Sequence, residues 1–212
     1  MTTQIKKTVQ GIPEPTIRRM PLYLAYLKTL DIKEKKHISA PAIAKDLGFD
    51  PTQITKDLGY TNVVGKTRVG FDIEELTIAI EDFLGFNKKN EAFLVGVGNL
   101  GSALMNYNGF DETGFKILVA FDSDPKIVGT EINNIKVLHI DTFQKLVKRM
   151  HVSIGIITVS DEFAQSIADH MVESGIKAIW NFAPTPIKES KNIIVENTSI
   201  YSNLAVIIKK LK

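Results

Sequence analysis

The chain has 212 residues, of which 44% are hydrophobic and 24% are charged, a composition typical of globular proteins. It contains no cysteine, which excludes disulfide frameworks, thiolate zinc sites and cysteine nucleophiles. The N-terminal segment lacks the apolar core of a secretion signal, and no apolar run is long enough to cross a bilayer. We therefore expect a cytoplasmic protein without a membrane partner.

Basic residues are concentrated in the N-terminal third. Residues 1–71 contain 12 Lys and Arg against 6 Asp and Glu, whereas residues 72–85 contain 5 acidic residues and no basic one. A positive charge excess confined to one end is typical of a module that contacts nucleic-acid phosphates. On charge alone, a solvated basic surface is an equally good explanation.

The first predicted element is an amphipathic helix. Apolar residues recur at three- and four-residue spacing from Ile17 to Leu30, directly after Pro15, which is typical of a helix start. This spacing gives the helix one face that can be buried.

Two short helices follow and form a helix-turn-helix candidate. Ser39 is a candidate N-cap for a helix over 40–47, and a second helix over 51–58 begins after Asp50. Gly48 allows a tight turn between them, as in helix-turn-helix motifs that bind DNA.

Residues 63–71 are predicted to form a two-stranded wing. Their β-branched residues flank a glycine-containing turn with Lys66 and Arg68. Asp72 is then predicted to cap a helix that ends at Gly85. Residues 1–85 are therefore predicted to form a winged-helix DNA-binding domain.

Residues 86–198 are predicted to form a Rossmann-like α/β domain. Six short apolar strands alternate with helical stretches, and this alternation implies right-handed crossovers and a parallel sheet. The predicted strands are Ala92–Val95, Phe115–Phe121, Lys136–His139, Val152–Val159, Ala178–Phe182 and Ile193–Val195.

Residues 199–212 are predicted to form a C-terminal amphipathic helix. Leu204, Ile207, Ile208 and Leu211 share one face, and lysines lie at the C-terminal end. We expect this apolar face to link two subunits; the alternative is that it packs on the sheet of its own domain.

A dinucleotide-binding motif follows the first strand of the second domain. The sequence Gly96-Val97-Gly98-Asn99-Leu100-Gly101 joins that strand to a helix. In this motif the first glycine allows a tight turn, the second admits the pyrophosphate, and the third lets the helix pack on the strand. The motif predicts that the domain binds NAD(H).

Asp122 ends the second strand, about 20 residues after the motif. A carboxylate at this place accepts hydrogen bonds from the adenosine ribose and repels a 2′-phosphate, which favours NAD over NADP. The alternative is that Asp122 serves only the Asp-Ser-Asp-Pro turn.

Two further segments follow strands and are expected to line the nicotinamide crevice. Thr158-Val159-Ser160 stands at the end of the fourth strand, and Asn181-Phe182-Ala183-Pro184 stands at the end of the fifth. An ordinary strand-to-helix turn is the alternative explanation for each of these residues.

The chain lacks the features of a hydride-transfer enzyme. Such enzymes position a substrate and an acid or base beside the nicotinamide with a second domain, for which there is no room here. The four histidines are scattered without metal-ligand spacing, and no tyrosine is followed four residues later by a lysine. We expect a sensor with no catalytic residue and no metal. A small NAD-dependent reductase with an N-terminal dimerisation module, and a coenzyme A-binding domain, are the alternatives.

Gln53 and Lys56 lie three residues apart on the second short helix and are expected to enter the major groove of DNA. Lys66 and Arg68 on the wing are expected to contact phosphates or a minor groove. The alternatives are a local capping role for Gln53 and a solvated side chain for Lys56. Ser39, Thr52 and Thr55 complete the predicted DNA-contacting set.

Taken in order, these motifs resemble the Rex family of redox-sensing transcriptional repressors over nearly the whole chain, from residue 12 to residue 211. The resemblance implies a homodimer on double-stranded operator DNA, whose C-terminal helix lodges between the two domains of the partner. It also implies that NADH favours a closed dimer that releases the operator, whereas NAD⁺ permits an open dimer that binds it. The matching pieces are Ile12-Pro13-Glu14, Gln53-Ile54, Lys56-Asp57-Leu58, Gly65-Lys66, Val69-Gly70, Gly96 to Gly101, Asn106-Tyr107 and Asn181 to Pro184.

The sequence departs from the family pattern at several positions. Thr55 replaces the usual arginine of the recognition helix, and residues 60–64 replace an aromatic-rich segment, which bears on the operator sequence. Ala25 and Ser199 replace an arginine and an aspartate. The resemblance implies that this charge pair, helped by a tyrosine matching Tyr107 at the cofactor site, senses the oxidised cofactor. The switch is therefore expected to rest on other contacts here.

Overall fold

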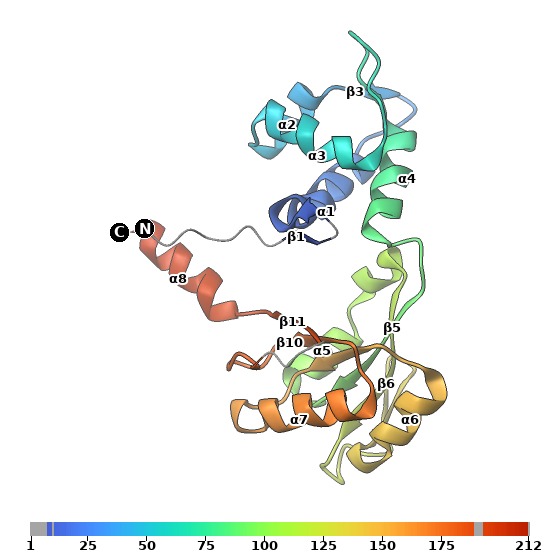
Figure 1. The fold of residues 1–212 in the computed structure, drawn as a ribbon, viewed down its shortest axis with the longest axis vertical. Coiled ribbons are helices and arrows are strands. Elements are labelled where there is room, and N and C mark those ends of the chain that lie inside the picture. Colours follow the sequence, from blue (N-terminus) through green and yellow to red (C-terminus); the bar gives the residue numbers. More distant parts are fainter. Residues whose placement is uncertain (1–7, 10, 189–192, 212) are drawn as a thin grey trace. The chain divides into compact units, whose positions relative to one another are not determined.

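The computed structural model of the chain describes residues 8–9, 11–188 and 193–211. The chain divides into two compact units, Met1–Lys88 and Lys89–Lys212 (Figure 1). Two predictions fall partly outside the described residues. They are the absence of a secretion signal, which concerns residues 1–7, and the C-terminal helix, which was predicted to end at Lys212. The two units have separate hydrophobic cores.

The first unit contains the predicted helices together with short strands. Its helices are α1 (Glu14–Lys28), α2 (Ala40–Leu47), α3 (Pro51–Leu58) and α4 (Ile73–Leu84), with a 3₁₀ turn η1 (Gly59–Thr61) after α3. Its strands form two antiparallel pairs, β1 (Thr8–Val9) with β2 (Ile12–Pro13) and β3 (His37–Ile38) with β4 (Phe71–Asp72).

Side-chain caps explain why α3 and α4 begin where they do. The carboxylate of Asp50 accepts the backbone N–H of Thr52 at 2.8 Å, and that of Asp72 accepts the N–H of Glu74 at 3.1 Å. These bonds satisfy N–H groups that have no partner within the helix. At the other end, Gly85 stops α4 with a φ of +71°, as predicted.

The wing differs from its prediction. Residues 63–71 do not form two paired strands; a single bridge joins Lys66 to Gly70, and the following strand β4 pairs with β3 instead. Gly70 explains the difference, because its φ is +97° and a Cβ there would lie only 2.4 Å from a carbonyl oxygen of β3. The wing is therefore a tight turn anchored to the segment before α2.

A buried carboxylate joins α1 to α3. Asp57 on α3 is 1% exposed, and its oxygens accept hydrogen bonds from three side chains of α1. The donors are the hydroxyl of Thr16 at 2.9 Å, the guanidinium of Arg19 at 2.6 and 2.9 Å, and the hydroxyl of Tyr23 at 2.8 Å. Gln53 on α3 itself donates its amide N–H to Asp57 at 2.9 Å. This network fixes the position of α3 on α1.

The network also sets the charge states of its members. Burial alone would raise the pKa of Asp57, but the hydrogen bonds from Arg19, Tyr23 and Thr16 hold it below its ordinary value. The hydrogen bond to Asp57 raises the pKa of Arg19, and burial raises that of Tyr23. Asp57 and Arg19 therefore form an ion pair at neutral pH.

The second unit is a doubly wound sheet, as predicted. Its strand order is β11-β10-β9-β5-β6-β8-β7, in which neighbouring strands are parallel except for the edge strand β7. The chain starts at β5 and builds outward first on one side and then on the other, so β5 marks the topological switch point. The strands are β5 (Asn90–Val95), β6 (Phe115–Asp122), β7 (Glu131–Ile132), β8 (Ile135–His139), β9 (Ile154–Ile157), β10 (Ala178–Asn181) and β11 (Ile194–Asn197).

Helices cover both faces of this sheet (Figure 1). One core lies under α6 (Phe143–Met150) and α7 (Asp161–Ser174) and contains an edge-to-face cluster of Phe93, Phe121 and Phe143. The other core lies under α5 (Asn99–Met105) and the 3₁₀ segment η2 (Asn108–Thr113). A further 3₁₀ turn, η3 (Ile140–Thr142), leads into α6.

The last helix, α8 (Ile200–Lys210), exposes its apolar face. Leu204, Ile207 and Ile208 are 48%, 57% and 47% exposed, and Leu211 just beyond them is 82% exposed. The alternative that this face packs on its own sheet is therefore wrong for the single chain. No helix in the described ranges is long and apolar enough to span a membrane.

Replacing Asp57 with alanine is expected to lower the free energy of unfolding by about 3 kcal/mol, because the largely buried guanidinium of Arg19 loses its partner. Urea unfolding of the full chain measures this change. A Glu34→Ala variant, which removes an exposed carboxylate, is the matched control and is expected to stay within about 0.5 kcal/mol of the parent. Equal stability of the two variants would contradict the role of the network.

The same carboxylate is expected to make stability pH-dependent. Since the pKa of Asp57 in the folded chain lies below its ordinary value of 3.8, its contribution is present above that pH and is lost as pH falls through the folded-state pKa. The stability difference between the parent and Asp57→Asn should therefore shrink below about pH 4. A difference that stays constant from about pH 7 to pH 3 would show that Asp57 is not the titrating group.

Candidate dinucleotide site and nucleic-acid interface

The loop between β5 and α5 places its three glycines in three different environments. Gly96 has a φ of +101°, and a Cβ there would lie 2.8 Å from a methyl group of Val159. A Cβ on Gly101 would lie 2.0 Å from the carbonyl oxygen of Gly96, so α5 packs directly on the loop. A Cβ on Gly98 would meet nothing within 4 Å. The geometry agrees with the tight turn predicted at Gly96 and the helix packing predicted at Gly101. It leaves open space above Gly98, whose contact with a pyrophosphate stays a prediction.

Asp122 holds this loop from the neighbouring strand β6. Its Oδ2 accepts the backbone N–H of Val97 at 2.7 Å, while Oδ1 accepts those of Ser123 at 2.7 Å and Asp124 at 2.9 Å. The carboxylate therefore serves the turn after β6, as the alternative interpretation held, and also fixes the glycine loop. Its contact with a ribose stays a prediction.

Thr158 holds the loop from the other side. It follows β9, and its hydroxyl donates to the carbonyl oxygen of Gly96 at 2.6 Å and to that of Val95 at 3.2 Å. The loop is consequently fixed by both strands that flank β5. These hydrogen bonds restrain the loop, and a restrained binding loop pays a lower entropic cost when it binds a ligand.

A cavity of about 370 Å³ opens at this loop, at the carboxyl ends of the strands and at the switch point where doubly wound sheets bind ligands. Of the predicted cofactor residues, Gly96, Gly98, Asp122, Thr158 and Val159 line it. Val97, Asn99, Leu100 and Gly101 belong to the same loop and to the first turn of α5. Ser160, which was predicted to line the crevice with Thr158 and Val159, also lines it. Residues that were not predicted add to the lining: Val95, Ser123, Ile140, Phe163 and Ile167.

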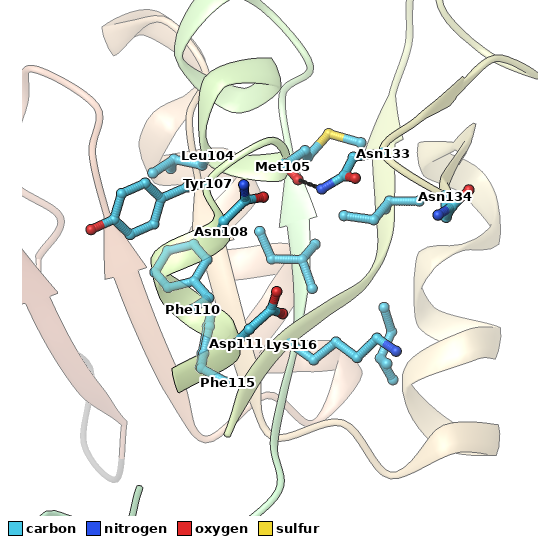
Figure 2. A pocket seen from close by; sticks show the side chains of 13 residues that line it. Leu104, Met105, Tyr107, Asn108, Phe110, Asp111, Phe115, Lys116, Asn133 and Asn134 are labelled. Atoms are coloured by element: carbon cyan, nitrogen blue, oxygen red, sulfur yellow. Dashed lines mark hydrogen bonds between the residues drawn. The ribbon is translucent and has the colours of Figure 1, made fainter. Parts of the chain in front are cut away.

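Tyr107 lies away from this cavity. The residue is 59% exposed, and its ring packs edge-to-face on Phe110, with ring centroids 5.0 Å apart. It lines a second cavity, shown in Figure 2. Its predicted contact with the cofactor is therefore not visible in the single chain and stays a prediction.

The segment after β10 is organised by a buried amide. Asn181 is 1% exposed, and its Oδ1 accepts the N–H of Ala183 at 3.0 Å. Its Nδ2 donates to the carbonyl of Thr185 at 3.0 Å and to the side chain of Asn197 at 2.8 Å. Phe182 packs against Trp180, and Pro184 is exposed. In this structure Asn181 shapes the loop, and none of the four predicted residues of this segment lines the cavity at the glycine loop.

Fewer of the predicted DNA-contacting side chains of α3 are free in the structure than the sequence suggests. Gln53 is half-buried and donates to Asp57, which is a local role of the kind that the alternative interpretation anticipated. Thr52, Thr55 and Lys56 are exposed. The hydroxyl of Thr55 bonds back to the carbonyl of Pro51 at 3.0 Å. Lys56 thus presents the one cationic side chain among the described residues of α3.

The remaining predicted DNA contacts flank α3 in the sequence. Lys66 and Arg68 are exposed on the wing turn, where Arg68 adopts a φ of +64°. Ser39 is half-buried, and its side chain accepts the N–H of Ala42 at 3.3 Å as the cap of α2. A helix-turn-helix followed by a basic turn is the arrangement with which winged-helix proteins approach DNA.

Comparison with known proteins identifies both parts of the chain. Residues 11–59 match a family described as "Putative DNA-binding protein N-terminus", and residues 87–185 match one described as "CoA binding domain". A protein of Bacteroides fragilis named "Redox-sensing transcriptional repressor Rex" is 46% identical over 100% of this chain and 96% of its own length. Proteins of the same name from Bacteroides thetaiotaomicron and Treponema denticola are 46% and 40% identical, over 94% and 93% of this chain and 91% and 95% of their own lengths.

Solved structures agree with this relationship. A crystal structure of RSP with β-NAD⁺ and operator DNA has a TM-score of 0.89 and 33% identity, covering 97% of this chain and 94% of RSP. A structure of RSP with β-NADH has a TM-score of 0.86 and 34% identity, covering 97% and 95% of the two chains. RSP is described as a Rex-family repressor.

A winged helix-turn-helix unit joined to a Rossmann-like domain with a glycine-loop cavity defines a class of ligand-responsive DNA-binding proteins. Within that class, the chain belongs to the Rex family of redox-sensing transcriptional repressors. The expectation of a repressor is confirmed, and the reductase alternative is set aside because these relatives are named as repressors.

Replacing Gly101 with alanine is expected to destabilise the chain by about 2 kcal/mol, because the new methyl group overlaps the Gly96 carbonyl. Gly98→Ala is the matched control, since its methyl group enters open space, and is expected to stay within about 0.5 kcal/mol of the parent. Thermal unfolding followed by circular dichroism compares the two. Equal destabilisation would contradict the assigned loop geometry.

Proposed function

We propose that the chain is a dimeric, cytoplasmic repressor that binds operator DNA through α3 and the wing and binds NADH at the glycine loop. The proposal further holds that NADH binding releases the operator. The observation that carries it is the cavity at the glycine loop, bordered by Asp122 and open above Gly98, in a chain that also has a helix-turn-helix unit.

The fit of NAD(H) to the cavity follows from the loop. The space above Gly98 suits a pyrophosphate, and backbone N–H groups at the start of α5 are donors without a helical partner. The carboxylate of Asp122 borders the same cavity, where it favours a ribose hydroxyl and disfavours an added phosphate. The RSP structures with β-NAD⁺ and β-NADH support this assignment.

Coenzyme A is the second candidate ligand, because residues 87–185 match a family described as a CoA binding domain. A glycine loop cradles the pyrophosphate of either molecule. The two ligands differ at the adenosine ribose, where coenzyme A and NADP each carry a phosphate that NAD lacks. The negative charge of Asp122 therefore favours NAD(H) over both.

Calorimetric titration is expected to show tighter binding of NADH than of NADPH or coenzyme A, by at least about tenfold, the factor that corresponds to about 1.4 kcal/mol. Gly98→Val should lose NADH binding while keeping its fold, because the side chain occupies the space above the loop. Equal affinity for NADH and NADPH would refute the role of Asp122. Retained affinity in Gly98→Val would mean that the loop does not hold the pyrophosphate.

The DNA interface is proposed to divide into reading and positioning contacts. Thr52, Thr55 and Lys56 face solvent on α3 and are proposed to read base edges, whereas the exposed Lys66 and Arg68 of the wing are proposed to contact the DNA backbone or a minor groove. Gln53 reaches a base only if it releases Asp57. We therefore expect Lys56 to contribute more to sequence discrimination than Gln53.

Lys66→Ala is expected to weaken binding to all DNA sequences and to flatten the dependence of affinity on salt by about one unit of slope, because one phosphate contact is lost. Fluorescence anisotropy at several salt concentrations measures both. Lys145→Ala, which removes an exposed lysine of α6, is the control with an unchanged slope. An unchanged slope in Lys66→Ala as well would remove the wing from the interface.

The apolar face of α8 supports a dimer. Contiguous apolar surface of this kind on a helix marks a protein interaction site. Its exposed members include Ile200, Leu204, Ile207 and Ile208. A second copy of the chain is the proposed partner, which agrees with the two-fold symmetry of operators read by helix-turn-helix dimers.

Titration of NADH and NAD⁺ into the protein on labelled genomic DNA fragments tests the whole proposal. NADH is expected to release the DNA. NAD⁺ is expected to have little effect, because Ala25 and Ser199 carry no charge. Operator binding that does not change when NADH is added would contradict the proposed function.

A further inference from the structure

A second cavity of about 420 Å³, shown in Figure 2, lies in the Rossmann-like unit. It shares no lining residue with the cavity at the glycine loop. Its walls come from the end of α5, from η2, from the first half of β6 and from the β7–β8 turn. Its volume is that of a small-molecule site.

The shortness of α5 explains why this cavity exists. The helix has 7 residues and spans about 10 Å, whereas β6 has 8 residues and spans about 26 Å. The helix therefore covers less than half of the strand on this face. The start of β6, around Phe115 to Leu118, is left to η2 and the β7–β8 turn, and the cavity lies between them.

The far wall of the cavity is fixed in place. Asn133 and Asn134 form the two-residue turn between β7 and β8, with φ angles of +50° and +60° that are typical of a type I′ hairpin turn. The Nδ2 of Asn133 donates to the carbonyl oxygen of Met105 at 2.8 Å, which ties the turn to the end of α5 (Figure 2). The cavity is thus held open by a hydrogen bond between its two sides.

One side of the cavity is apolar. Phe110 packs edge-to-face against both Tyr107 and Phe115, with ring centroids 5.0 Å apart in each pair. Ile117 is buried and Ile135 is half-buried beside them. This surface suits a hydrocarbon or aromatic group rather than a fully polar ligand.

The rim carries two opposite charges that do not pair. Asp111 and Lys116 both line the cavity, and Figure 2 shows their charged ends apart from each other. Within the described ranges, neither side chain makes a hydrogen bond or an ion pair, and the same holds for the amides of Asn108 and Asn134. A ligand with only a negative charge would be repelled by the carboxylate of Asp111, and a ligand with only a positive charge would be repelled by the ammonium group of Lys116. A ligand with both charges satisfies both groups.

We propose that this cavity binds a free amino acid with an apolar side chain. Its ammonium group pairs with Asp111, its carboxylate pairs with Lys116, and its side chain lies against Phe110, Ile117 and Ile135. The amides on the rim supply further hydrogen bonds. This assigns to the protein a second small-molecule ligand, chemically unrelated to NADH and held at a separate site.

Calorimetric titration of the full chain with L-leucine, L-methionine and L-phenylalanine tests the proposal. At least one is expected to bind saturably with a dissociation constant below about 1 mM. For the tightest binder, the amide lacks the carboxylate and the deaminated acid lacks the ammonium group. Each analogue is expected to bind at least about tenfold more weakly, since each loses one charge-assisted hydrogen bond. Absence of saturable binding by all three amino acids would overturn the proposal.

Two substitutions locate the binding. Asp111→Asn and Lys116→Gln are each expected to weaken it by about tenfold. Glu131→Gln and Lys136→Gln, exposed charges on the adjacent hairpin outside the lining, are the matched controls and are expected to change nothing. NADH titration of the same variants reports separately on the glycine loop and is expected to be unaffected. Unchanged amino-acid binding in Asp111→Asn and Lys116→Gln, or an equal loss of NADH binding, would overturn the assignment.

Discussion

The second unit depends on how its glycine loop is held between two strands. Asp122 at the end of β6 accepts the N–H of Val97, and Thr158 after β9 donates to the carbonyl of Gly96. These bonds, with α5 packed against the loop through Gly101, fix the switch point of the sheet. One short helix then connects the two cavities, since it begins at the glycine loop and ends at Met105 beside the second cavity. The ligand sites follow from that arrangement.

In the first unit, too, a carboxylate is shared between several elements, and there it fixes a helix. Asp57 is surrounded by donors from α1 and fixes α3, the helix proposed to enter the major groove. Because Gln53 is one of these donors, the network also decides which side chains of α3 remain for DNA. The hydrogen-bond network around Asp57 is buried and charged, and its contribution is to fix the orientation of α3. A helix that reads bases must be placed with little freedom if its side chains are to discriminate.

Local signals predicted much of this architecture. Caps such as Asp50 and Asp72 marked the helix starts, and the glycine motif with its flanking strand located the loop between β5 and α5. What the sequence did not reveal depends on contacts between distant segments. The pairing of β3 with β4 follows from the close approach of Gly70. The burial of Asn181 and the cavity contribution of Phe163 likewise arise only when strands and helices assemble. No local pattern distinguishes such residues.

Binding of the dinucleotide and binding of the operator are proposed to be coupled, and such coupling is reciprocal by thermodynamic necessity. If NADH weakens operator binding tenfold, about 1.4 kcal/mol of coupling is required, and the operator must weaken NADH binding by the same factor. The most direct test is the affinity of the protein for NADH, measured by calorimetry with and without saturating operator DNA. Weaker NADH binding is expected in the presence of the operator. Identical affinities would contradict the coupling and would leave two binding functions on one chain without a switch between them.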